Sequence, residues 1–119
     1  FDEPAFKTPF EVSLTVHDNH TAISSGPAMQ ETALEGGLKR VDFQTTQPIP
    51  TYLLAFAVGP FDVVEAQDLP PTEYRDRPVP LRGIAVAGRG PELRQALDST
   101  RGILEAMELE AFEYDCFPL

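Results

Sequence analysis

The sequence has no tryptophan, a single cysteine, and only 9 lysines and arginines against 19 aspartates and glutamates. One cysteine, Cys116, cannot form an internal disulfide, which excludes a disulfide-stapled framework. The formal net charge of −10 disfavours nucleic acid and anionic membranes as partners, because both attract basic surfaces. No apolar run approaches the ~20 residues that a transmembrane helix requires.

The common catalytic motifs are also missing from the sequence. It contains no H-E-x-x-H zinc motif, no Gly-rich phosphate loop, no G-x-S-x-G turn and no C-x-x-C pair. The 119 residues suffice for one small domain. Residue chemistry alone therefore predicts a soluble, acidic, mostly β polypeptide, with no catalytic, substrate-binding or metal-ligating residue of its own.

Alternation of apolar and polar residues predicts strands in the first half of the chain. Residues 10–17 alternate strictly, which is typical of a half-buried strand. The continuous apolar run at 52–58 predicts a strand that is buried on both faces. The remaining predicted elements are a short strand entering a turn at 22–27, a hairpin over 29–44 that turns at 35–37, and a strand at 61–65.

The second half predicts a loop, a strand and a long helix. Residues 67–77 are polar and rich in proline, which indicates a surface loop, and residues 79–87 are predicted to form a strand. Pro91 marks a helix start, because its missing N–H has no helical partner at that position. The helix is predicted over 91–112, and its apolar stripe comprises Leu93, Ala96, Leu97, Leu104, Met107 and Ala111.

Three small groups of residues could carry chemistry, and a structural role is favoured for each. The adjacent carboxylates Asp2 and Glu3 are expected to fix a turn through backbone N–H bonds. His17 and His20 form the only metal candidate, but a zinc site needs at least three protein ligands, so surface histidines are favoured. Cys116 lies among acidic residues, whereas a reactive thiolate needs positive surroundings.

Acidic residues gather late in the predicted helix, and we interpret them as a solvated face. Negative charge there meets the negative end of the helix dipole. The residues are Glu105, Glu108, Glu110, Glu113 and Asp115.

Four segments resemble landmarks of the aminopeptidase N-like zinc metallopeptidases. Residues 1–7, Phe-Asp-Glu-Pro-Ala-Phe-Lys, are similar to the family's (C)-x-D-E-P-x-x-K segment, and residues 21–27 to the turn that follows it. Residues 41–56 are similar to the signature F-x-x-T-x-x-(M/I)-x-T-Y-L-x-A-F, and the junction at 58–61 also matches. The resemblance extends loosely to the end of the chain, where residues 112–119 depart from the family's Y-F-G-x-P-Y-P-L.

The resemblance implies a mostly β fragment of a larger enzyme. Residues 1–62 would be the end of a saddle-like N-terminal β domain, and residues 63–119 the strand and helix that open a thermolysin-like α+β catalytic domain. The parent would remove N-terminal residues from peptides, using a zinc ion held by H-E-x-x-H and a later glutamate, with a G-A-M-E-N loop for the free amine. These motifs belong downstream, so the fragment itself is expected to be an inactive scaffold.

The expected partners are peptides with a free amino terminus and the rest of the chain's own catalytic domain, but not nucleic acid or membrane. Two other functions stay open: a non-enzymatic β module that binds a protein or peptide at a sheet edge, and a metal-binding module built on His17 and His20. The compartment is not determined, with the cytoplasm favoured over secretion. Unpaired sheet edges further predict low stability for the isolated chain.

Overall fold

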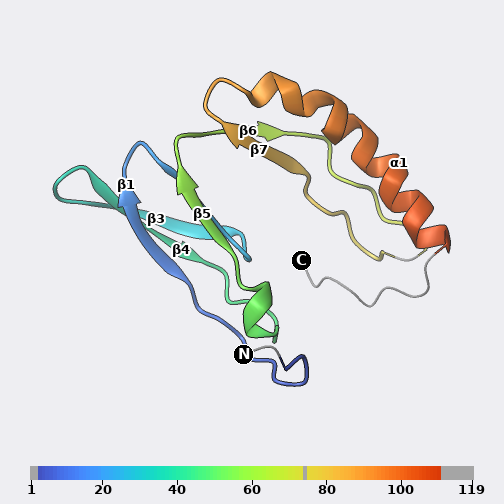
Figure 1. Ribbon diagram of the computed structural model, residues 1–119, viewed down its shortest axis with the longest axis horizontal. Coiled ribbons are helices and arrows are strands. Elements are labelled where there is room, and N and C mark those ends of the chain that lie inside the picture. The colour runs from blue at the N-terminus through green and yellow to red at the C-terminus, as the bar shows by residue number, and fades with distance from the viewer. Residues whose placement is uncertain (1–2, 74, 111–119) are drawn as a thin grey trace. The chain divides into compact units, whose positions relative to one another are not determined.

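The computed structural model describes residues 3–73 and 75–110 of the chain. The chain divides between Pro60 and Phe61 into two compact units, whose elements are labelled in Figure 1. The first unit contains strands and one short 3-10 helix, and the second joins a hairpin to the long helix α1. This order confirms the predicted fold class, a mostly β segment followed by a strand and a helix.

The first unit is built from antiparallel strands. β4 lies at the centre of a three-stranded sheet with the order β1-β4-β3, and β2 pairs with β5 in a separate two-stranded sheet. The elements are β1 (Ser13–His17), β2 (Thr21–Ser24), β3 (Ala28–Leu34), β4 (Leu38–Phe43), the 3-10 helix η1 (Thr51–Leu53) and β5 (Phe56–Gly59).

The core of the first unit lies on one face of β1 and β4. Val16, Val41 and Phe43 are buried, and Val12, Leu14 and Ala22 pack against them. The predicted alternation over 10–17 is confirmed, because even positions are buried or half-buried and odd positions are exposed. The regular ladder starts only at Ser13; before it the segment is held by single backbone bonds, including one from Phe43 N to Val12 O at 3.0 Å.

The predicted hairpin is confirmed as β3 and β4, which pair in register from Leu34 with Leu38. The turn between them contains Gly36 and Gly37, whose φ angles are 76° and 71°. These angles lie in the left-handed region, where a side chain is strained. Two glycines therefore allow the chain to reverse direction within three residues, and the register of the hairpin follows from that turn.

The prediction of a doubly buried strand at 52–58 is wrong. The start of this run folds as the 3-10 helix η1, and only Phe56–Gly59 form a strand. Phe56 is 67% exposed, and Tyr52 and Leu53 are each 53% exposed. β5 pairs with β2 alone, so within the described residues no second neighbour or covering layer shields its side chains. Apolar composition predicted the strand but not its neighbours.

The second unit places α1 along a hairpin made of β6 and β7 (Figure 1). Its elements are β6 (Phe61–Glu65), β7 (Arg82–Val86), the 3-10 helix η2 (Gly90–Leu93) and α1 (Arg94–Glu110). Pro91 lies in the first turn, as predicted, but that turn is 3-10 and precedes the α-helix. The predicted helix end at 112 lies outside the described residues.

Helix α1 approaches the hairpin closely at Gly83. A Cβ atom at this position would lie 2.9 Å from Leu93 Cδ1 and 3.3 Å from both terminal carbons of Leu97. The missing side chain therefore creates the room in which the two leucines pack, which explains a glycine in a strand interior.

The predicted apolar stripe of α1 is correct only in part. Leu93, Leu97 and Leu104 are half-buried, whereas Ala96 is exposed and Met107 is 49% exposed. The β6–β7 hairpin is only two strands wide, so it covers one side of the helix's apolar stripe and leaves the other side exposed. The last predicted member, Ala111, lies outside the described residues.

Between β6 and β7 the described residues 66–73 and 75–81 form an irregular arm, which agrees with the predicted loop at 67–77. The arm is not wholly a surface segment, however, because Leu69 is only 3% exposed. Backbone bonds between Leu69 and Val79, at 2.8 and 3.0 Å, continue the hairpin past the regular strands. Within the part of the chain that the structure describes, no helix has the length and apolar character needed to cross a membrane.

Candidate functional site

The two histidines of the metal hypothesis do lie side by side. The rings of His17 and His20 meet edge to face, with their centroids 5.5 Å apart, across the turn between β1 and β2. His20 N donates to His17 O at 3.0 Å, which closes the turn. Nowhere in residues 3–73 and 75–110 do three or more His, Cys, Asp or Glu side chains gather as a metal site. The pair therefore has no third ligand among these residues.

Glu3 has the turn-forming role expected of it. Its side-chain Oε1 accepts a hydrogen bond from Ala5 N at 3.4 Å, and its carbonyl accepts one from Phe6 N at 3.1 Å. The carboxylate is thus used locally. The other half of this pair, Asp2, lies outside the described residues, and so does Cys116.

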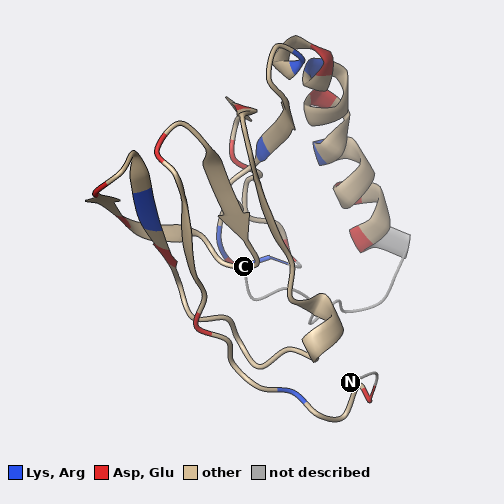
Figure 2. Ribbon diagram, turned by 60° about the vertical axis from the view of Figure 1, so that its left-hand side comes forward, with Lys and Arg blue, Asp and Glu red and all other residues tan. Residues whose placement is uncertain are grey.

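The acidic residues of α1 do not form one solvated face, and this prediction is corrected at Glu108. Acidic and basic residues are interspersed along the helix (Figure 2), and the exposed Glu105 accepts a bond from Arg101 Nε at 2.8 Å. The side chain of Glu108 is only 14% exposed and forms an ion pair with Arg75 of the arm. Its partner lies 33 residues away in sequence. The structure does not describe Glu113, Asp115 or the side chain of Glu110.

Asp62 on β6 is a carboxylate that the sequence analysis missed. Its Oδ2 accepts hydrogen bonds from the backbone N–H groups of Gly88 at 2.8 Å and Gly90 at 2.9 Å. Gly88 has a φ of 84°, and a Cβ at Gly90 would lie 3.1 Å from Asp62 Oδ2. The spacing Gly88-Arg89-Gly90 before Pro91 was the available signal for a tight turn. Asp62 therefore anchors that turn through two backbone N–H groups.

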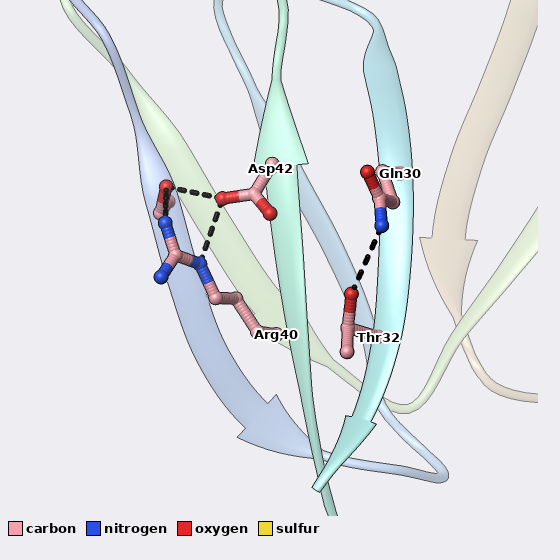
Figure 3. A network of polar contacts seen from close by, with 5 residues as sticks. Gln30, Thr32, Arg40 and Asp42 are labelled. Atoms are coloured by element: carbon pink, nitrogen blue, oxygen red, sulfur yellow. Dashed lines mark hydrogen bonds and ion pairs between the residues drawn. The ribbon is translucent and has the colours of Figure 1, made fainter.

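A polar network crosses the exposed face of β1 and β4 (Figure 3). Asp42 Oδ1 accepts bonds from Ser13 Oγ at 2.5 Å and from Arg40 Nε at 2.8 Å, and Arg40 Nη2 donates to Ser13 Oγ at 3.0 Å. The Ser13 hydroxyl first, and the Arg40 guanidinium second, hold the pKa of Asp42 below its ordinary value. A carboxylate kept ionised in this way is a poor proton donor near neutral pH.

An open depression of about 390 Å³ lies beside β7 in the second unit. Its charged side chains, Arg89 and Glu92, bond to each other at 2.9 Å and so neutralise one another. The lining residues are Phe61, Ile84, Ala85, Val86, Arg89, Glu92 and Leu93. The depression is mostly apolar and presents no nucleophile or unpaired acid, so it offers a surface for packing and no reacting group.

Comparison with known proteins gives the class of the chain. Residues 1–53 match the Peptidase M1 N-terminal domain family. The chain is 40% identical over 81 residues to a puromycin-sensitive aminopeptidase of Caenorhabditis elegans, a match that spans 67% of this chain and 8% of that protein. It is also 40% identical over 67 residues to an aminopeptidase N of Acetobacter pasteurianus, which spans 56% of this chain and 19% of that protein.

Solved structures give the same result. The M1 zinc metallopeptidase of Deinococcus radiodurans superposes with a TM-score of 0.59 and 33% sequence identity, over 73% of this chain and 19% of that one. The chain therefore resembles a part of the M1 aminopeptidases, with residues 1–53 matching their N-terminal domain, which confirms the predicted resemblance. The chain spans between 8% and 19% of the length of these relatives.

Proposed function

We propose that this chain is a scaffold segment of a zinc-dependent aminopeptidase, which removes residues from the amino terminus of peptides. The observation that carries the proposal is the match of residues 1–53 to the M1 N-terminal domain, joined to the similarity in fold with an M1 zinc metallopeptidase. The relatives reported above are aminopeptidases or metallopeptidases, and none of them favours a non-enzymatic β module.

In this proposal residues 1–62 form the end of the saddle-like N-terminal β domain, and residues 63–119 open the thermolysin-like catalytic domain. The division of the chain into compact units at Pro60 and Phe61 supports a change of domain in this region. The change from paired strands to a hairpin with a long helix supports it further. The chain's closest partner would be the rest of its own catalytic domain.

Zinc enters this proposal only as the cofactor of the whole enzyme, where it would polarise a water molecule for attack on the peptide carbonyl. The residues that the structure describes do not fit a zinc ion, because they contain no group of three possible ligands. We therefore assign no catalytic or metal-binding role to the residues that the structure describes. Its contribution is the framework, and peptides with a free amino terminus are the proposed substrates.

A chimeric enzyme tests the proposal. The segment of the Deinococcus radiodurans enzyme that corresponds to residues 1–119 is replaced by this chain, and release of the N-terminal residue from a short peptide is measured with and without a zinc chelator. The matched control carries the same segment from the Acetobacter pasteurianus aminopeptidase N. We expect chelator-sensitive release from both chimeras and none from the purified 119-residue chain.

Two results would overturn the proposal in different ways. An inactive but folded and zinc-loaded chimera, beside an active control, would show that this chain does not provide M1 scaffolding. Chelator-sensitive cleavage by the 119-residue chain alone would show that the scaffold assignment is wrong, because the chain would then hold its own metal centre.

A further inference from the structure

Thr72, Arg75 and Glu108 form a polar cluster where the irregular arm meets α1, and we call this cluster the clasp. Arg75 Nε lies against Glu108 Oε1 as an ion pair. Arg75 Nη2 donates to Glu108 Oε2 at 3.4 Å, and Thr72 Oγ1 donates to the same oxygen at 3.2 Å. Glu108 thus receives contacts from two residues of the arm through both of its carboxylate oxygens.

The clasp is shielded from water to an unusual degree for this chain. The side chains of Arg75 and Glu108 are 17% and 14% exposed, whereas those of Arg101 and Glu105 on the same helix are 57% and 39% exposed. An exposed pair contributes little, because water and salt screen it. Removing one member of a shielded pair leaves the other charge buried and uncompensated, which is strongly unfavourable.

Arg75 depends on Glu108 in particular. Its Nη1 is buried with no hydrogen-bond partner among the residues that the structure describes, and its Nε faces Glu108 as an ion pair without hydrogen-bond geometry. The guanidinium charge is therefore balanced, within the described residues, by one carboxylate. Loss of that carboxylate would drive Arg75 toward water and take the tip of the arm with it.

The arm has few other anchors. Ala66 N donates to Leu81 O at 3.0 Å, and the Leu69–Val79 bridge follows it. Beyond Leu69, the described backbone bonds of the arm are those between Thr72 and Arg75, at 2.9 and 3.3 Å. These last bonds stay within the tip and do not tie it to the rest of the unit. The contacts that do so, among those described, come from the clasp.

We propose that the clasp is a positioning device that holds the tip of the arm against the last turns of α1, with Glu108 as its central residue. The inference does not depend on the aminopeptidase proposal, because it concerns contacts inside the second unit. Opening of the clasp frees the arm from its tip down to and including the Leu69–Val79 bridge. The β6–β7 ladder stays paired. The same opening releases Glu108 on the helix from Thr72 and Arg75 of the arm.

Hydrogen exchange on the full 119-residue chain tests the clasp. In Glu108→Gln, the amides of Leu69 and Val79 are expected to exchange at least tenfold faster than in the unaltered chain, while the amides of the β6–β7 ladder change less than twofold. The matched control is Glu105→Gln, which removes an exposed charge from the same helix and should change all of these rates less than twofold. Equal acceleration in both variants, or acceleration spread evenly over the unit, would overturn the proposal.

A double variant separates the clasp from a general loss of stability. Arg75→Met combined with Glu108→Leu removes both charges at once, and hydrophobic replacement of a buried pair is often neutral. Exchange at Leu69 and Val79 should then return to within threefold of the unaltered chain; rates as fast as in Glu108→Gln would overturn the proposal.

If the variants do not fold, hydrogen exchange is measured on the unaltered chain instead. The amides of Leu69 and Val79 should then exchange at least tenfold more slowly than those of the exposed turn at 35–37. Equal rates at the two places would overturn the clasp.

Discussion

Strand β5 is more apolar than strand β4, and yet its side chains are more exposed. β4 contains a lysine, an arginine and an aspartate, and yet its Val41 is 0% exposed. β5 and the residues before it are almost entirely apolar, and yet Phe56 is 67% exposed and Val58 41%. β4 has a paired strand on each side, whereas β5 pairs with β2 alone. In this chain apolar character alone does not bury a side chain, because the neighbouring strands decide which apolar side chains are covered.

The same lesson holds for the polar residues of the second unit. Glu105 and Glu108 are both helical glutamates paired with an arginine, three residues apart on α1. Glu105 bonds to the preceding turn of its own helix and stays exposed, whereas Glu108 is covered by the arm. The same kind of substitution at a covered position and at an exposed one tests whether cover by neighbouring segments explains the difference.

The largest effect on stability is expected from placing a charge at one valine of β4 and, for comparison, at one valine of β5. Val41→Asp puts a carboxylate into the core of the first unit, where it has neither water nor a partner. We expect a loss of about 4 kcal/mol or more in the free energy of unfolding. Val58→Asp should cost about 1 kcal/mol or less, because that side chain already reaches water. Urea unfolding followed by circular dichroism measures both.

Val41→Ala is the control for this pair, since it removes two methyl groups without adding charge and should cost about 2 kcal/mol. If Val58→Asp destabilised the chain as much as Val41→Asp, β5 would have to be buried in solution. The original interpretation of residues 52–58 as a doubly buried strand would then be restored.

A smaller effect is expected at two glycines with different surroundings. Gly83→Val would force a branched side chain into the space that Leu93 and Leu97 occupy, at a cost of about 1–3 kcal/mol. At Gly102, on α1, a Cβ would have no atom of the described residues within 4 Å, its own helix backbone and chain neighbours aside. Gly102→Ala should therefore stabilise the chain by about 0.5–1 kcal/mol, because alanine favours the helix.

Thermal unfolding of the two glycine variants should show changes of opposite sign. A gain in stability from Gly83→Val would mean that α1 does not pack on the hairpin at this point. A loss from Gly102→Ala would mean that the far side of the helix is covered.

The sequence predicted the elements better than their surroundings. The alternation at 10–17 and the turn at 35–37 were correct, because a period of two residues and a pair of glycines are local signals that need no knowledge of other segments. The exposure of residues 52–58 could not be predicted in this way, since it depends on which strands lie beside them. Family landmarks identified the class of protein and supplied no site residue within this chain.

Buried contacts between distant residues were the other failure. Glu108 looked like part of a solvated face because its neighbours on the helix are charged, and nothing near it in sequence points to Arg75. Asp62 was missed for the same reason, because its partners Gly88 and Gly90 lie 26 and 28 residues further on. A local pattern predicts which side of an element faces inward, but it does not predict which polar groups meet there.

The smallest effect is expected at Asp42, which has partners and whose side chain is 34% exposed. Its pKa is lowered in the folded chain, chiefly by the Ser13 hydroxyl and then by Arg40. A lowered folded pKa means that the ionised form stabilises the fold. That contribution is present above the ordinary value of 3.8 and is lost as the pH falls through the lower folded pKa.

The difference in stability between the unaltered chain and Asp42→Asn should therefore be present at pH 6 and decrease as the pH falls below 3.8. It should also shrink in high salt, because water and ions reach this carboxylate freely. Unfolding in urea across this pH range measures the difference, with Ser13→Ala as a second variant that raises the folded pKa toward its ordinary value. A difference that grew as the pH fell would require the protonated form of Asp42 to be the one that binds Ser13 and Arg40. The network on β1 and β4 would then be held by a neutral acid, and the sign of its contribution would be the reverse of the one argued from its geometry.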